Sequence, residues 1–258
     1  GRKPTPSGNS AAHRRKDMDS SPVLCYPCSK RDRVFHRDPP KGIQQTSTIL
    51  GGTDMPAYFS ILFELKKGPD AIRNFCEALL HSGPSFKSGY YESQNDSFQE
   101  ILAWNQNKLN ENFQLGAAEP AFHDYKQMQF SYLAFSEVRC FILNERESPA
   151  FHFHLIVPED DLLEYGEEAE GVCSVRRKTE QMEQLKSVAK KMWGNTALLA
   201  IQTGWEESDF PPSAEEIAGG ARPQAEPFCV LPSAFCRREP GLAYEPVGRT
   251  GMLIEDVT

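Results

Sequence analysis

Residues 128–157 read MQFSYLAFSEVRCFILNERESPAFHFHLIV, and this stretch decides the fold class. It contains three β-rich runs, at 128–135, 138–143 and 151–157, separated by short polar or turn-forming segments. The connections between the runs are too short for the crossover that a parallel pair of strands requires. The stretch therefore predicts an antiparallel meander of three strands.

A strand and a helix are expected on the N-terminal side of this meander. Residues 57–65 are rich in aromatic and branched residues and end at a Lys-Lys-Gly turn. Directly afterwards Ile72, Phe75 and Leu79 recur at helical spacing until Gly83. A strand followed at once by an amphipathic helix favours a sheet with a helix packed on it.

Further helices are predicted from their start signals and their periodicity. Ser97 with Glu100, and Ser213 with Glu216, form capping-box patterns in which the two side chains satisfy each other's backbone donors. Residues 179–193 place their apolar side chains on one stripe. More strands are expected at 197–202, 226–231 and 252–257. We therefore predict an α+β domain with a mainly antiparallel sheet and helices packed on one face.

Charge divides the chain near residue 54. Residues 1–54 carry ten Lys and Arg against five Asp, whereas residues 55–258 carry 18 cations against 31 anions. The first segment is rich in Pro, Ser, Gly and Arg, so it cannot bury enough apolar surface to offset its ordering entropy. We predict that residues 1–54 are a disordered basic segment and that residues 55–258 form a single α+β domain.

A second hypothesis concerns the same boundary. Met55 stands just before the strand expected at 57–65, and the preceding Gly-Gly-Thr-Asp can be encoded with a purine-rich ribosome-binding signal. We therefore predict that translation starts at Met55. If residues 1–54 are translated, their charge would suit nucleic acid or an anionic membrane. Cys25-x-x-Cys28, with His36 nearby, would then suggest zinc, although a structural zinc site needs four ligands.

Composition argues against several functional classes. No window approaches 18 consecutive apolar residues, and the first residues lack the apolar segment of a secretory signal. Seven Cys in 258 residues are too few for a disulfide scaffold, which favours a reducing cytoplasm. A net charge of −8 disfavours nucleic-acid binding. No nucleotide-binding, zincin or nucleophile-elbow motif occurs, so neither a cofactor nor a catalytic residue is assigned.

One strand offers an alternative chemistry. His152 and His154 alternate with Phe151 and Phe153, so both imidazoles should point to one face of the sheet. Two such imidazoles can bind a metal, and Cys140 in a neighbouring run could act as a nucleophile beside His152. The alternative function is therefore a small metal- or Cys/His-dependent hydrolase. Because no third ligand has a fixed spacing, no metal site is assigned.

The most unusual feature of the sequence is its concentrated acidity. Seven carboxylates lie within residues 159–170, and three more follow Trp205 in a Pro-bounded loop. A concentrated negative field attracts a basic partner, and an aromatic residue among charges is typical of an interface. The residues predicted to bind a protein partner are Glu159, Asp160, Asp161, Glu164, Trp205, Glu206, Glu207 and Asp209. The competing interpretation is a solvated loop that keeps the protein soluble.

Four short segments carry a likeness to known proteins. They are WNQNKL at 104–109, FHLIVPE at 153–159, IQTGWE at 201–206 and EPF at 226–228. With these segments the chain resembles the immunity proteins of bacterial polymorphic-toxin systems, which are cytosolic α+β proteins that bind and block a toxin domain. The resemblance implies a non-enzymatic protein whose acidic, aromatic-bearing surface covers a basic toxin domain such as a nuclease. From the acidic charge, the lack of a long apolar segment and the lack of nucleotide-binding motifs, we expect no nucleic acid, membrane or cofactor as a partner.

Overall fold

The computed structural model describes residues 1, 24–27, 57–112, 125–167, 172–195 and 197–256. The helices are α1 (Ala71–Ser82), α2 (Phe98–Asn110), α3 (Thr179–Met192) and α4 (Ala214–Gly219). The strands are β1 (Leu24–Pro27), β2 (Tyr58–Lys66), β3 (Ser85–Gly89), β4 (Met128–Ser131), β5 (Val138–Leu143), β6 (Ala150–Pro158), β7 (Leu163–Glu167), β8 (Val172–Arg177), β9 (Leu198–Trp205), β10 (Phe228–Pro232), β11 (Leu242–Val247) and β12 (Gly251–Asp256).

Most of the described strands belong to one sheet. Its strand order is β11-β12-β10-β9-β2-β6-β5-β4-β3, and neighbouring strands pair antiparallel. The expected α+β fold with a mainly antiparallel sheet is confirmed. The meander expected at 128–157 is also confirmed, because β4, β5 and β6 are successive neighbours. The strand expected at 57–65 is β2, which lies between β6 and β9 near the middle of the sheet.

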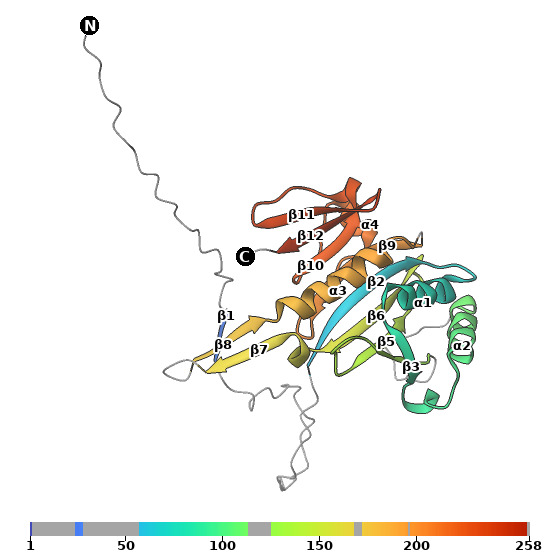
Figure 1. Cartoon of the computed structure of the whole chain (residues 1–258). Helices are drawn as coiled ribbons and strands as arrows, with labels where there is room; N and C mark the ends of the chain where they lie inside the picture. The colour runs from blue at the N-terminus through green and yellow to red at the C-terminus, as the bar shows by residue number, and fades with distance from the viewer. Residues whose placement is uncertain (2–23, 28–56, 113–124, 168–171, 196, 257–258) are drawn as a thin grey trace, which may run out of the picture.

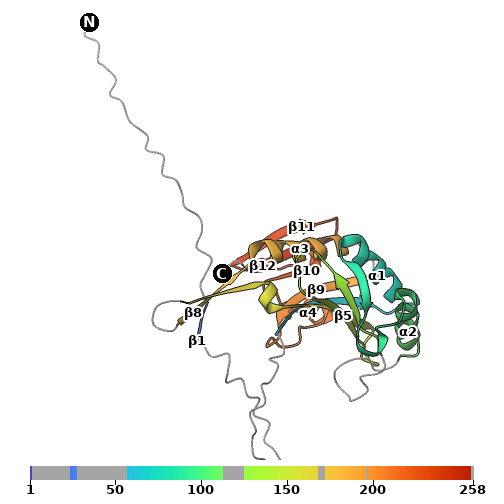
Figure 2. The ribbon, with the colours of Figure 1, turned by 60° about the horizontal axis from the view of Figure 1, so that its bottom comes forward.

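The main core lies between the sheet and three helices. Figure 2 shows α1 and α3 on one side of the sheet, and α2 packs beside α1. The Phe75 ring on α1 stacks on Phe153 at a centroid distance of 3.9 Å and meets the edge of Phe63 at 5.1 Å. All three rings are fully buried, and each such ring contributes about 1.5–3 kcal/mol by leaving water. The alternation expected for Phe151 and Phe153 therefore points their rings into this core.

The opposite face of the sheet is covered only in part. The short helix α4 packs there, and Ala214 and Ile217 join Ala200 and Leu231 in a second, smaller apolar cluster. The Glu64 carboxylate on β2 anchors the start of α4 by accepting a hydrogen bond of 2.7 Å from the Ala214 N–H. The helices α1–α3 thus share one face, and α4 lies on the other.

Several expected elements have different limits. Residues 158–163 suggest the start of a helix, but Glu159–Asp161 form a single 3₁₀ turn that leads into the β7–β8 hairpin. This hairpin extends away from the main sheet (Figure 1). Strands β3 and β11 lie at the two edges of the sheet and were not expected from the sequence.

One short strand of the N-terminal segment is described in the structure. Leu24–Pro27 form β1, which pairs antiparallel with β8. The disorder expected for residues 1–54 stays a prediction. The pairing satisfies backbone groups that the edge of β8 would otherwise leave open. The predictions for Cys28, His36 and the Met55 start lie outside the described residues. Within the described ranges, no helix is both long and apolar enough to cross a membrane.

Candidate functional site: an acidic rim beside an aromatic face

The two acidic loops of the sequence meet at one end of the sheet. The backbone N–H of Glu206, after β9, donates to Glu159 Oε1 at 3.4 Å. The N–H of Tyr58, at the start of β2, donates to Glu206 Oε2 at 2.9 Å. The contact follows from the strand order, because β2 pairs with both β6 and β9 and so brings their C-terminal ends together.

We call the carboxylates at this end of the sheet the acidic rim. Its members are Glu137, Glu159, Asp160, Asp161, Glu206, Glu207, Asp209 and Glu226. Asp161 accepts hydrogen bonds of 2.8 Å from both the N–H and the hydroxyl of Ser136, which fixes the 3₁₀ turn. The Ser208 hydroxyl donates to Glu226 and holds the loop after β9 in the same way. The rim is therefore held in place by hydrogen bonds from neighbouring loops.

Glu164 lies apart from this group. It is in β7, directly opposite Arg176 of β8. Opposite charges at such a position attract each other across the two strands and offset each other's field. Of the other acidic residues on the same stretch, Glu168 and Glu170 lie outside the described residues.

Trp205 is expected to be an aromatic anchor on the interface, but in the structure its side chain is turned toward the core. The Trp205 ring is half-buried and packs on Phe59 of the core at a centroid distance of 4.9 Å. The exposed aromatic side chain of the same loop is Phe210, which is 58 % exposed. Sequence reasoning missed Phe210, although its position directly after Asp209 and before two prolines marks it as a loop residue among acids.

Beside the rim, stacked π-systems cross the sheet on the face opposite α1–α3. We call this group the aromatic face; its members are Tyr58, Tyr90, Tyr91, Arg139, Phe141, His154 and Phe210. The His154 ring stacks with Phe141 at 4.8 Å and with Phe210 at 6.0 Å. The Arg139 guanidinium lies over the Tyr58 ring at 5.0 Å and over the Tyr90 ring at 4.7 Å.

Rim and aromatic face are joined through Glu137. Arg139 Nε lies 3.7 Å from Glu137 Oε1, and the Tyr58 hydroxyl donates to Glu137 Oε2 at 3.4 Å. Burial is the main reason why the pKa of Tyr58 lies above its usual value. The hydroxyl therefore stays neutral at physiological pH and remains a donor to the carboxylate.

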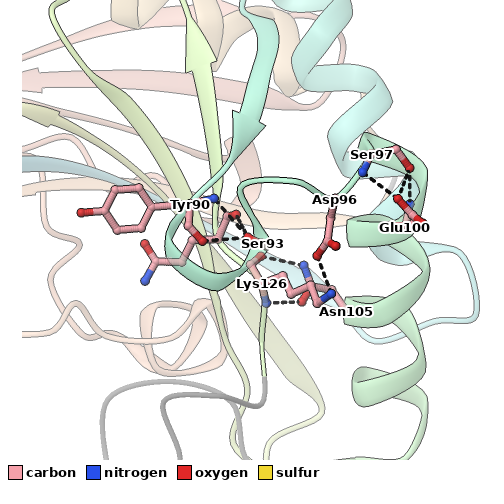
Figure 3. A network of polar contacts seen from close by, with 8 residues as sticks. Tyr90, Ser93, Asp96, Ser97, Glu100, Asn105 and Lys126 are labelled. Atoms are coloured by element: carbon pink, nitrogen blue, oxygen red, sulfur yellow. Dashed lines mark hydrogen bonds and ion pairs between the residues drawn. The ribbon is translucent and has the colours of Figure 1, made fainter.

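A polar scaffold holds the loop that carries Tyr90 and Tyr91 (Figure 3). The Ser93 hydroxyl donates to the Tyr90 carbonyl at 2.8 Å and accepts from the Tyr90 N–H at 3.1 Å. Lys126 Nζ pairs with Asp96 at 2.5 Å, while the Lys126 backbone is bound to the Asn105 amide on α2. Tyr91 has a φ of +53° and is 76 % exposed. The loop thus presents a tyrosine in a backbone conformation that bulky residues rarely adopt.

Of the two histidines of β6, His154 is buried and His152 is half-buried, and both are uncharged at neutral pH. Burial lowers the pKa of His152 to about 4, and burial together with the neighbouring His152 lowers that of His154 to about 3. His154 is 8 % exposed, and its Nε2 has no hydrogen-bond partner among the described residues. Both side chains lie on the face expected from the alternation with Phe151 and Phe153.

The Cys/His pair of the alternative hydrolase does not come together. Cys140 pairs with Leu155 and is fully buried in the α1–α3 core, on the opposite face of the sheet from His152 and His154. Burial raises the pKa of the Cys140 thiol far above its usual value, which disfavours the thiolate. In the part of the chain that the structure describes, no three His, Cys, Asp or Glu side chains are placed to hold a metal ion.

Comparison with known protein families, with curated proteins and with solved structures finds no match to this chain. The function is therefore inferred from the residues themselves.

Proposed function

We propose that this chain is a cytoplasmic immunity protein that binds a cognate toxin domain through the acidic rim and neutralises it. The observation that carries the proposal is the direct contact between Glu159 and Glu206. Two acidic loops far apart in the sequence form one surface, and their backbone N–H groups and hydroxyls hold the carboxylates in place. Such a surface is preorganised for a cationic partner, which lowers the cost of binding.

The charge balance favours a basic partner. Two cations contact residues of the rim: Arg139 pairs with Glu137, and Lys178 Nζ donates to the Asp160 carbonyl at 2.8 Å. They stand against the eight carboxylates of the rim. Carboxylates gathered at one end of the sheet attract cations over a range of about 10 Å at roughly 0.1 M salt, and over a longer range at lower salt. Nucleases bind the phosphates of their substrate with Lys and Arg side chains, which make the nucleic-acid cleft basic. A toxin of that class would be drawn to the rim, and its cleft would be blocked there.

Phe210 supplies an aromatic contact within the acidic surface. Interfaces typically surround a few large aromatic side chains with polar and charged residues that exclude water. Phe210 has this setting, since Asp209 precedes it and the rim lies next to it. The half-buried Trp205, at the start of the same loop, packs on Phe59 and so attaches the loop to the core.

The proposal is tested by capture of a partner and by neutralisation. The tagged full chain is used to isolate proteins from the cells that make it, and any stoichiometric partner is then expressed with and without the chain. We expect a basic partner whose expression stops growth and whose effect is removed by the wild-type chain. Glu206→Lys with Glu207→Lys should lose this protection.

A matched control separates charge at the rim from charge in general. Glu77 and Glu111 are exposed carboxylates on the α1 and α2 side of the molecule, and their double replacement by Lys changes the net charge equally. We expect this control variant to protect as the wild type does. A partner that is neutralised equally well by the rim variant and by the control would contradict the proposal.

A further inference from the structure

We propose that the aromatic face is the second half of the docking surface and that it binds an arginine- or lysine-bearing segment of the partner protein by stacking. This inference rests on the proposed function and names the chemistry of the contact. It adds Tyr91, Tyr90, Tyr58 and Phe141 to a surface that otherwise consists of carboxylates and Phe210.

The aromatic face is continuous across five separate stretches of the chain. Phe210, His154 and Phe141 form one line of stacked rings, while Tyr58, Arg139 and Tyr90 form a second. The two lines are joined on β5, where Arg139 and Phe141 are two residues apart and point to the same side. The Tyr91 ring extends the second line, with its centroid 5.0 Å from that of Tyr90.

The two ends of the aromatic face are exposed, whereas its middle is buried. Phe210 and Tyr91 are 58 % and 76 % exposed, whereas His154 between the two phenylalanines is 8 % exposed. Tyr91 keeps its positive φ because Ser93, Asp96 and Lys126 fix the loop around it. Backbone strain of this kind persists where the surrounding structure enforces it, and it is concentrated at functional sites. Rigid exposed tyrosines bind with little loss of side-chain entropy.

The charges around the face select a cationic occupant. Glu137, Glu206 and Asp209 border it, so a guanidinium or ammonium group over the rings would gain both cation–π and carboxylate interactions. Arg139 is held between two tyrosines and paired with Glu137, which reduces its repulsion of a second cation. Phosphate groups of a nucleic acid would instead meet the carboxylates.

The test uses a synthetic probe and the full chain. The probe is the capped peptide Arg-Gly-Arg-Gly-Arg, and the comparison probes are Glu-Gly-Glu-Gly-Glu and a ten-nucleotide thymidine strand. Binding is followed by NMR chemical shifts during titration. We expect the arginine peptide alone to bind, and the signals of Tyr91, Phe141 and the Arg139 side chain to shift.

Two variants remove the exposed ends of the face without adding strain. Tyr91→Asn keeps a residue that tolerates positive φ, and Phe210→Ala truncates an exposed ring. Each should weaken binding of the arginine peptide about three- to tenfold. Leu133→Asn is the matched control, because Leu133 is also exposed, at 66 %, and also has a positive φ, at +46°. This control should bind the peptide as the wild type does.

Unchanged binding by Tyr91→Asn and Phe210→Ala, or tighter binding of the thymidine strand, would overturn the inference.

The proposed function and the inference about the aromatic face fail in different ways. If both variants still neutralise a captured toxin as the wild type does, the aromatic face is not part of the docking surface although the proposed function stands. If no toxin is neutralised but the arginine peptide still stacks on the face, the proposed function fails alone.

Discussion

The histidines of β6, of which His154 is buried and His152 half-buried, are the clearest case of a residue whose environment changes its usual protonation. An exposed His is protonated below about pH 6.5. His154 lies between Phe141 and Phe210, and His152 meets the edge of the Phe210 ring at 5.3 Å. Their low pKa values follow from this apolar setting, which penalises the charged form.

Acid should therefore destabilise the protein through these two side chains. Below about pH 6.5 the unfolded chain binds protons on both histidines, whereas the folded chain does so only near pH 4 and 3. Stability is then lost as pH falls, by about 2 kcal/mol per histidine between pH 7 and pH 5. The raised pKa of Glu64 acts in the opposite direction and offsets part of the loss at the lower end.

Urea unfolding at pH 7 and pH 5 measures this effect. The double variant His152→Asn, His154→Gln should lose most of the pH dependence, even if it is less stable at pH 7. An equally large loss of stability between pH 7 and pH 5 in the wild type and in the variant would contradict the assignment.

Gly89 is required by the close approach of the loop that carries Tyr91. A Cβ at this position would lie 1.9 Å from the Ser93 carbonyl oxygen, so the backbone would have to move. Gly89→Ala should lower the free energy of unfolding by about 1–3 kcal/mol. Gly68→Ala is the control, because a Cβ there meets nothing within 4 Å. Equal stability of the two variants in thermal denaturation would show that the loop is not held as described.

At the scale of elements, local signals define helix starts accurately. The capping boxes at Ser97 and Ser213 are both present in the structure, and each serine accepts a hydrogen bond from the backbone three residues on. The capping-box carboxylates of Glu100 and Glu216 have lowered pKa values because they accept hydrogen bonds from those serines. Such contacts involve only neighbouring residues, so the sequence suffices to predict them.

Replacing the capping-box residues of α2 should show that Ser97 and Glu100 stabilise the helix start together. Ser97→Ala should lower the free energy of unfolding by about 1 kcal/mol. Glu100→Ala should cost a similar or smaller amount, and the double variant should cost less than the two single effects combined, since they share the same hydrogen bonds. If the double variant loses as much unfolding free energy in urea as the two single variants added together, the two residues of the capping box are not coupled.

Strands were predictable only where they cross the core. The central strands β2, β5 and β6 alternate or run apolar because one or both faces are buried. The edge strand β3 has mostly exposed or half-exposed side chains, and β11 carries Pro246, which is tolerated at an edge. The β7–β8 hairpin protrudes from the sheet and has no core pattern. These elements are held by pairing with a neighbour, which the local sequence does not reveal.

At the scale of the whole molecule, the site depends on the order of the strands. The sequence identified the acidity of the loops after β6 and β9, and the structure explains why they meet, since β2 lies between those strands. The sequence alone could not identify the aromatic face, because its members come from five separate stretches of the chain. Tyr90 and Tyr91 were missed because nothing in their neighbouring residues distinguishes them from ordinary loop residues.

The association rate of the captured partner is the measurement that tests the central proposal most directly. If the acidic rim attracts and blocks a basic toxin domain, raising the salt from roughly 0.05 M to roughly 0.5 M should slow association about tenfold or more. Glu206→Lys with Glu207→Lys should slow it to a similar degree at low salt, while the control replacements at Glu77 and Glu111 should not. An association rate that is unchanged by salt and by the rim variant would contradict the proposal that the rim binds the partner.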